Sequence, residues 1–99
     1  MENFDLDTKR KLKVGKPTYW RVYCLNDDFT PFEVVEEILG KFFNKTGADA
    51  RDIAMETHRN GRGLIGIYVR EEAETRMANA MAFAKNNGGR HFRLKLEEE

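Results

Sequence analysis

Several features that define whole classes of protein are missing from this chain of 99 residues. It contains a single cysteine, Cys24, so no disulfide can form within the chain, and the strand-like sequence around Cys24 indicates a packing role. Its seventeen basic and seventeen acidic residues cancel. Because nucleic-acid-binding domains usually carry a net positive charge, this balance argues against a nucleic-acid partner.

Long apolar runs are also absent. No segment is apolar over a length sufficient to cross a bilayer, and the first residues lack the apolar stretch of a secretion signal. We therefore expect a cytoplasmic protein without membrane association. A chain of this length forms one small domain, in which a large enclosed active site would compete with the core for apolar side chains. We expect that domain to be monomeric.

Residues 1–17 differ from the rest of the sequence. They are rich in charged side chains and show no clear periodicity, and Gly15 and Pro17 mark the end of this stretch. We expect a flexible N-terminal extension over residues 1–17 and a folded core domain over residues 18–99. Composition alone assigns the extension no function.

The core domain shows the periodicities of both strands and helices. Strands are predicted where aromatic and β-branched residues cluster or alternate with polar ones, over residues 19–25, 64–69 and 92–96. Helices are predicted from the spacing of apolar residues, over residues 31–44 and 46–60 and from residue 71 to the Asn87-Gly88-Gly89 turn. The order strand, helix, helix, strand, helix, strand (βααβαβ) predicts an α+β fold. We expect a small α/β sandwich, with three helices on one face of a three-stranded antiparallel sheet.

The third predicted helix has an alanine- and methionine-rich stripe. The residues expected to face the core are Ala73, Met77, Ala80, Met81 and Ala84. The acidic residues that open this helix suit the positive end of the helix dipole.

The loop after the first strand, Asn26-Asp27-Asp28-Phe29-Thr30-Pro31, holds more hydrogen-bond acceptors than a turn requires. Its second half continues into Thr30-Pro31-Phe32-Glu33, which has the sequence of a capping box with Thr30 as the N-cap. Its first half, Asn26-Asp27-Asp28, is not required to start the helix. Since loops at strand ends commonly carry function, these three acceptors are candidates for holding a positively charged group.

His58, near the end of the second predicted helix, can complete such a site. Asn26, Asp27 and a neutral His58 would surround an ammonium group with charge-assisted hydrogen bonds. Phe32 and Val35, at the adjoining helix start, would line an apolar pocket beside it. A ligand that offers both an ammonium and an apolar side chain is the free N-terminus of a peptide. The alternative for His58 is a satisfied residue near the core.

Enzyme alternatives use the same side chains. Asp27, Asp28 and His58 are residue types of metal sites and of acid–base pairs, so a small metal-dependent or acid–base hydrolase is the alternative function. The chain has only two histidines, and it lacks a local metal-binding motif and a nucleophile elbow. The glycine-rich run over residues 61–66 follows a helix and opens a strand, the reverse of a dinucleotide-binding loop. We expect no enzyme activity, no metal and no cofactor.

The longest motif of the chain resembles that of a known family. Residues 19–33, Tyr-Trp-Arg-Val-Tyr-Cys-Leu-Asn-Asp-Asp-Phe-Thr-Pro-Phe-Glu, resemble the signature of ClpS, the adaptor of the bacterial Clp protease. Three further motifs match at the expected spacing: Lys41-Phe42-Phe43, His58 followed by Gly61, and Ala73-Glu74-Thr75-Arg76. The resemblance covers about residues 18–99.

This resemblance implies an adaptor of the N-end rule pathway. Such adaptors bind N-degron substrates, which begin with a bulky apolar residue, and deliver them to the ClpA ATPase and the ClpP peptidase. The resemblance implies that the α-amino group is held by Asn26, Asp27 and His58. It implies a side-chain pocket formed by Asp28, Thr30, Phe32, Val35, Ala54, Thr57 and Phe92. It further implies that the N-terminal domain of ClpA is docked by Glu71 and Arg76, and that the ATPase is engaged by residues 1–17.

Three pocket positions depart from the family pattern. Phe32 stands where the family commonly has Met, while Ala54 and Thr57 stand where it has Met and Val. A phenyl ring adapts less readily to different ligands than a methionine side chain. We therefore expect a narrower preference, in which Phe and Tyr are kept in preference to Leu and Trp. A further alternative is a paralogue that docks on the ATPase without recognising N-termini.

Overall fold

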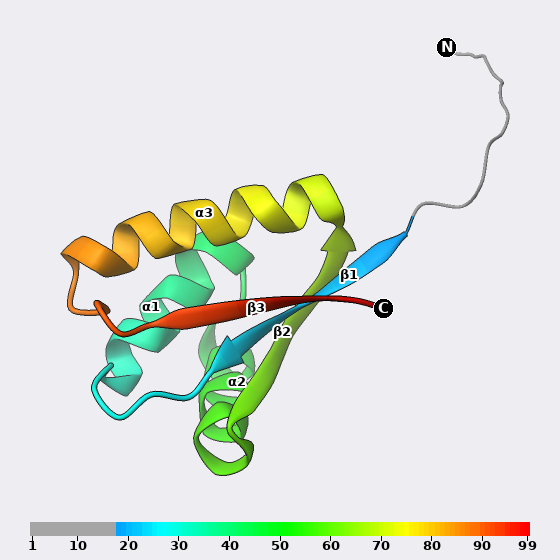
Figure 1. The fold of residues 1–99 in the computed structure, drawn as a ribbon. Coiled ribbons are helices and arrows are strands. Elements are labelled where there is room, and N and C mark those ends of the chain that lie inside the picture. The colour runs from blue at the N-terminus through cyan, green and yellow to red at the C-terminus, as the bar shows by residue number, and fades with distance from the viewer. Residues whose placement is uncertain (1–17) are drawn as a thin grey trace, which may run out of the picture.

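In the computed structural model, which describes residues 18–99, the chain folds into three strands and three helices (Figure 1). The elements are β1 (Tyr19–Leu25), α1 (Phe32–Phe43), α2 (Gly47–Asn60), β2 (Arg62–Val69), α3 (Arg70–Asn86) and β3 (Arg93–Glu98). The predicted order and the α+β class are confirmed. The predicted extension over residues 1–17 lies outside the described residues.

The sheet is antiparallel, with β1 at its centre between β2 and β3. The three helices lie on one side of this sheet, and no helix of residues 18–99 covers the other side (Figure 1). On the covered side, alternate residues of β1, Val22 and Cys24, are buried. They pack in one apolar cluster with the inward residues of α1, which include Ile38, Leu39 and Phe43. This two-layer packing is the sandwich that the sequence predicts.

Helix α3 packs through small side chains. Ala73, Ala80 and Ala84 are fully buried, at spacings of seven and four residues that keep them on one face of the helix. The prediction that Met81 belongs to this stripe is wrong, because its side chain is 37% exposed. Met81 follows Ala80 directly, so it lies about 100° around the helix from it and falls at the edge of the buried face.

The start of α1 differs from the predicted capping box. The helix begins at Phe32 after Pro31, and no side chain caps it. The carbonyl oxygen of Pro31 accepts hydrogen bonds from the N–H groups of Val34, at 3.0 Å, and Val35, at 3.1 Å. The Thr30 hydroxyl, predicted to be the cap, donates instead to the Asp27 carboxylate. A charged acceptor makes the stronger hydrogen bond, so it competes successfully for this hydroxyl.

Within the described part of the chain, none of the helices combines the length and the apolar character needed to cross a bilayer.

Candidate functional site

A cavity of about 360 Å³ opens where β1 ends, between the loop that follows it, the start of α1 and the second half of α2. Its volume is at the small end of the range for ligand-binding pockets. It is lined by Cys24, Leu25, Asn26, Asp27, Asp28, Phe29, Thr30, Pro31, Phe32, Val35, Ala54, Thr57 and His58. Apart from Phe92, every residue that sequence predicts for amino-group binding or for the side-chain pocket therefore borders one cavity.

Asp27 organises the loop at the rim of this cavity. Its Oδ1 accepts hydrogen bonds from the N–H groups of Phe29, at 2.8 Å, and Thr30, at 2.7 Å. The Thr30 hydroxyl donates to both carboxylate oxygens of Asp27, at 3.0 and 2.8 Å. The loop thus folds around the one carboxylate, in the manner of an Asx turn. Sequence reasoning missed this role because it assigned the local hydrogen bonding to Thr30.

These contacts also keep Asp27 charged. Burial by itself would raise the pKa of the Asp27 carboxyl group. The hydrogen bonds from Phe29 and Thr30, together with the positive charge of His91, outweigh that effect and lower the pKa below its ordinary value. Asp27 therefore places an ionised carboxylate at the rim, where a cationic ligand group would meet it.

The other two polar residues predicted to bind the amino group, Asn26 and His58, come from different parts of the fold. The N–H of Asn26 donates to the Gly61 carbonyl at 2.9 Å, which ties the loop to the end of α2. His58 is exposed on the last turn of α2, with its ring edge-on to Phe32 at 5.7 Å between centroids. The alternative that His58 is a satisfied residue near the core is therefore wrong. Between residues 18 and 99, the side chains of Asn26 and His58 make no hydrogen bond, so both remain free to bind a ligand.

The walls of the cavity are apolar. Val35 and Ala54 are buried, while Phe32 is 42% exposed and stands at the mouth. The Thr57 hydroxyl donates to the Ile53 carbonyl one helical turn earlier, at 2.8 Å, so its hydrogen-bonding need is met within α2. Thr57 consequently makes the wall less polar than its hydroxyl suggests.

Cys24 forms part of the cavity lining at the end of β1, and sequence reasoning assigned it only to packing. Burial raises the pKa of its thiol to about 11, against the opposing effect of a hydrogen bond with Thr57. The thiol is therefore neutral at physiological pH and acts as a small apolar group. The signal available in the sequence was its place on the inward face of β1, immediately before the acceptor-rich loop.

The structure does not bring Phe92 to the cavity. Its side chain is 1% exposed and belongs to the central apolar cluster, and its N–H donates to the Gly89 carbonyl at 2.9 Å. The expectation of a pocket wall came from resemblance, whereas the geometry makes Phe92 an anchor for the start of β3. It is a large apolar residue at the junction of a turn and a strand, where burial stabilises the turn.

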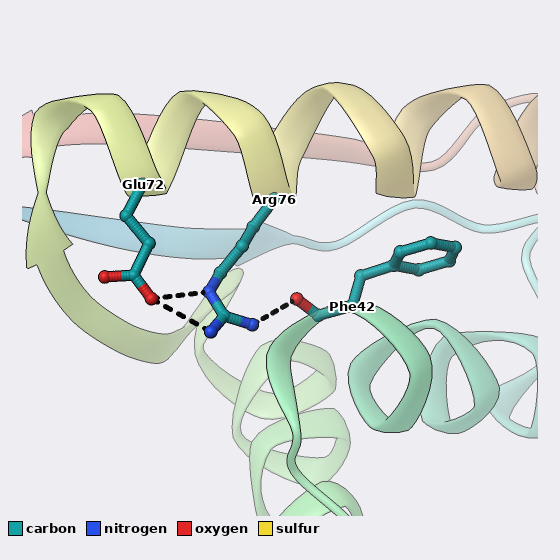
Figure 2. A network of polar contacts seen from close by, with 3 residues as sticks. All are labelled: Phe42, Glu72 and Arg76. Carbon is teal, nitrogen blue, oxygen red and sulfur yellow. Dashed lines mark hydrogen bonds and ion pairs between the residues drawn. The ribbon is translucent and has the colours of Figure 1, made fainter.

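Neither of the residues predicted for partner docking, Glu71 and Arg76, lines the cavity. Figure 2 shows Arg76 of α3 between Glu72 and the last turn of α1. Its Nε and Nη2 donate to Glu72 at 3.0 and 2.9 Å, and its Nη1 donates to the Phe42 carbonyl at 2.9 Å. Arg76 therefore links α3 to α1, and its positive charge suits the negative end of the α1 dipole. Glu71 is exposed, with no ion-pair partner among residues 18–99.

In the part of the chain that the structure describes, no group of three or more His, Cys, Asp and Glu side chains is arranged to hold a metal ion. The predicted hydrolase alternative required such an arrangement, or an acid–base pair, from Asp27, Asp28 and His58. The cavity instead joins apolar walls to a rim of hydrogen-bond acceptors, which suits a binding module.

Comparisons with known proteins agree with this description. The profile of the family described as ATP-dependent Clp protease adaptor protein ClpS matches residues 15–97. The ClpS adapter of Hyphomonas neptunium is 43% identical over 84 residues, which cover 85% of this chain and 71% of that protein. The ClpS adapter of Deinococcus radiodurans is 41% identical over 81 residues, which cover 82% and 72%. The structure of Agrobacterium tumefaciens ClpS2 bound to L-phenylalaninamide matches with a TM-score of 0.79 at 31% identity, covering 85% of this chain and 100% of that one.

The fold, the cavity and these likenesses define an adaptor protein of the Clp protease system. The chain belongs to the ClpS family. It is an adaptor and not an enzyme, so the hydrolase alternative is wrong.

Proposed function

We propose that this cytoplasmic, monomeric adaptor binds the free α-amino group and the bulky apolar side chain of an N-degron substrate and delivers that substrate to ClpA for degradation by ClpP. Asn26, Asp27 and His58 hold the amino group, and the cavity beside them takes the side chain. The observation that carries the proposal is one cavity in which an ionised carboxylate and two polar side chains, which make no hydrogen bond among residues 18–99, border apolar walls.

The energetics require both halves of this ligand. Removing an ammonium from water is costly, and the cost is recovered only if several good acceptors replace the lost water. Burying the side chain of Phe or Leu contributes about 1.5–3 kcal/mol. A micromolar dissociation constant corresponds to about 8 kcal/mol, which neither contribution supplies alone. The solved relative of the same fold binds L-phenylalaninamide, a ligand with both an amino group and an apolar side chain.

The shape of the cavity supports a narrowed preference for the first residue. Phe32 stands at the mouth with its ring edge-on to His58, so an incoming side chain must pass a stiff aromatic group. The small side chain of Ala54 offsets part of the cavity volume that the Phe32 ring occupies. We propose that planar Phe and Tyr side chains are bound in preference to Leu and Trp. Comparable affinities for all four would contradict this preference.

Fluorescence anisotropy with labelled peptides tests the proposal. A Phe-initiated peptide with a free N-terminus is expected to bind with a micromolar dissociation constant or tighter, and the same peptide with an acetylated N-terminus is expected to bind at least about 100-fold more weakly. A series covering all twenty first residues then gives the preference. Equal affinities of the free and acetylated peptides would exclude amino-group recognition. Binding to ClpA without any peptide binding would instead indicate a paralogue that does not read N-termini.

We further propose that Glu71 and Arg76 contribute differently to docking on the N-terminal domain of ClpA. Glu71 is free to meet a basic group of the partner, whereas Arg76 positions the surface by joining α3 to α1. Glu71→Gln is expected to weaken ClpA binding by about two- to fivefold with unchanged stability. Arg76→Gln is expected to lower the free energy of unfolding by about 1 kcal/mol. Calorimetry of ClpA binding and urea denaturation measure the two effects.

Peptide affinity provides the control for both docking variants, since neither residue lines the cavity. A weakened affinity of Arg76→Gln for ClpA with no loss of stability would show that Arg76 contacts the partner directly.

A further inference from the structure

A second hollow, of about 480 Å³, lies on the other side of the Asn26–Phe29 loop. Its remaining lining residues are Arg90, His91 and Arg93, from the turn before β3 and the first residue of that strand. The two hollows thus share one wall, which is the loop that borders the proposed amino-group site. A ligand in the first cavity that extended past this loop would reach the second hollow.

The basic residues of the second hollow are held in place by buried structure. Phe92, between His91 and Arg93, is almost completely buried, and the Gly89 N–H donates to the Ala84 carbonyl at 2.8 Å to close the turn. Arg93 pairs with Leu25, the last residue of β1, across the sheet. The ring of His91 lies 4.5 Å from that of Phe29, at the tip of the loop. These side chains therefore project from a fixed backbone.

The two guanidinium groups of this hollow, those of Arg90 and Arg93, form no ion pair with a carboxylate in the part of the chain that the structure describes. Among residues 18–99, neither Arg90 nor Arg93 forms an ion pair, although six other ion pairs are present. The guanidinium of Arg93 has one polar contact in this range, a long one of 3.5 Å to the Asn26 carbonyl. Asp27 and Asp28 also border the hollow, but the Asp27 carboxylate accepts its hydrogen bonds from the loop itself.

We infer that this hollow binds the carboxylate of an acidic residue that directly follows the N-terminal residue of the substrate. The inference rests on the proposed function, which places the first side chain in one hollow and the α-amino group at the shared loop. The second residue then leaves the loop beside Arg90 and Arg93. An arginine presents several N–H donors in a planar fork, which matches the geometry of a carboxylate. The second hollow thus adds a preference for an acidic second residue to the selection of the substrate's first residue by the first cavity.

Three C-terminally labelled, free-amine peptides of otherwise identical sequence test this inference. All begin with Phe; one has Glu at position two, one has Gln there, and one has Gln at position two and Glu at position five. The Glu-2 peptide is expected to bind about three- to fivefold tighter than the other two at low salt. The difference is expected to shrink in about 1 M salt, where exposed charges are screened.

Variants locate the effect. The double variant Arg90→Gln, Arg93→Gln is expected to remove the preference for Glu at position two. The matched control is Arg51→Gln, an exposed arginine of α2 that lines neither hollow, and it is expected to keep the preference. Circular dichroism of each variant checks that the fold is intact.

Three outcomes would overturn the inference while leaving the proposed function in place. They are equal affinities for the Glu-2 and Gln-2 peptides, a preference that survives in the double variant, and a Glu-5 peptide that binds as tightly as the Glu-2 peptide. The last would show long-range attraction without a site. If no free-amine peptide binds, the proposed function fails and the inference fails with it.

Discussion

Asp27→Asn is expected to weaken the binding of a free-amine, Phe-initiated peptide by about 10- to 100-fold. The substitution keeps an oxygen that can accept from the Phe29 and Thr30 N–H groups, so the loop can keep its shape. It removes the negative charge that faces the ligand ammonium, and a hydrogen bond to a charged group contributes about 1.5–3 kcal/mol. Fluorescence anisotropy measures the change. Asp27→Ala, which also removes the loop acceptor, is expected to bind more weakly still.

Asp52→Asn is the matched control, because Asp52 is an exposed aspartate of α2 that does not line the cavity. It is expected to bind the peptide with unchanged affinity. An Asp27→Asn variant that binds as tightly as the natural chain would show that the amino group is held elsewhere.

The lowered pKa of Asp27 gives the same variant a pH signature in stability. The folded state favours the ionised carboxylate, so its contribution is fully present above the ordinary value of 3.8 and is lost as the pH falls through the lower folded value. The natural chain is therefore expected to be more stable than Asp27→Asn at neutral pH, and the difference is expected to vanish in acid. Urea denaturation at several pH values measures it.

Gly63→Ala is expected to lower the free energy of unfolding by about 2–3 kcal/mol. A methyl group on Gly63 of β2 would overlap the Thr57 hydroxyl and lie 2.7 Å from the Ile53 carbonyl oxygen and 3.2 Å from the Thr57 nitrogen. Two of these atoms belong to the backbone of α2, which cannot rotate away, so the helix must move off the sheet. Since Thr57 lines the cavity, peptide binding is expected to weaken as well.

Gly40→Ala is the matched control for the added methyl group. Its new methyl would lie 3.5 Å from Thr46 and 3.6 Å from the Lys45 carbonyl, which is ordinary contact. Because alanine is the better helix former, this variant is expected to be as stable as the natural chain or up to about 1 kcal/mol more stable. Urea denaturation compares the two. A Gly63→Ala variant within about 0.5 kcal/mol of the natural chain would mean that α2 and β2 tolerate a wider separation.

The cavity illustrates what local sequence patterns can and cannot predict. The loop after β1 was recognisable as a site because it carries more acceptors than a turn needs. Its internal hydrogen bonding was not recognisable, because Thr30 fits two local arrangements, the N-cap of α1 and the donor to Asp27. The hydrogen bond to Asp27 is favoured because the fold places that charged carboxylate within reach of the Thr30 hydroxyl.

Long-range packing decided the roles of residues far from that loop. His58 reaches the rim of the cavity only because α2 lies across the end of β1. Phe92 does not line the cavity, because its side chain is buried in the core. Arg93 meets the loop through its pairing with Leu25, sixty-eight residues earlier in the chain. No periodicity of the sequence encodes such distances.

The sequence by itself determined the order of the helices and strands, the α+β class, the family signature and the acceptor-rich loop after β1. These follow from hydrophobic periodicity and local motifs, which depend on neighbours a few residues apart. Only the tertiary structure decided which residues form the pocket wall and which acceptors and charges, among residues 18–99, have no partner within that range. Those properties depend on the packing of helices against a sheet, which brings together side chains from separate elements.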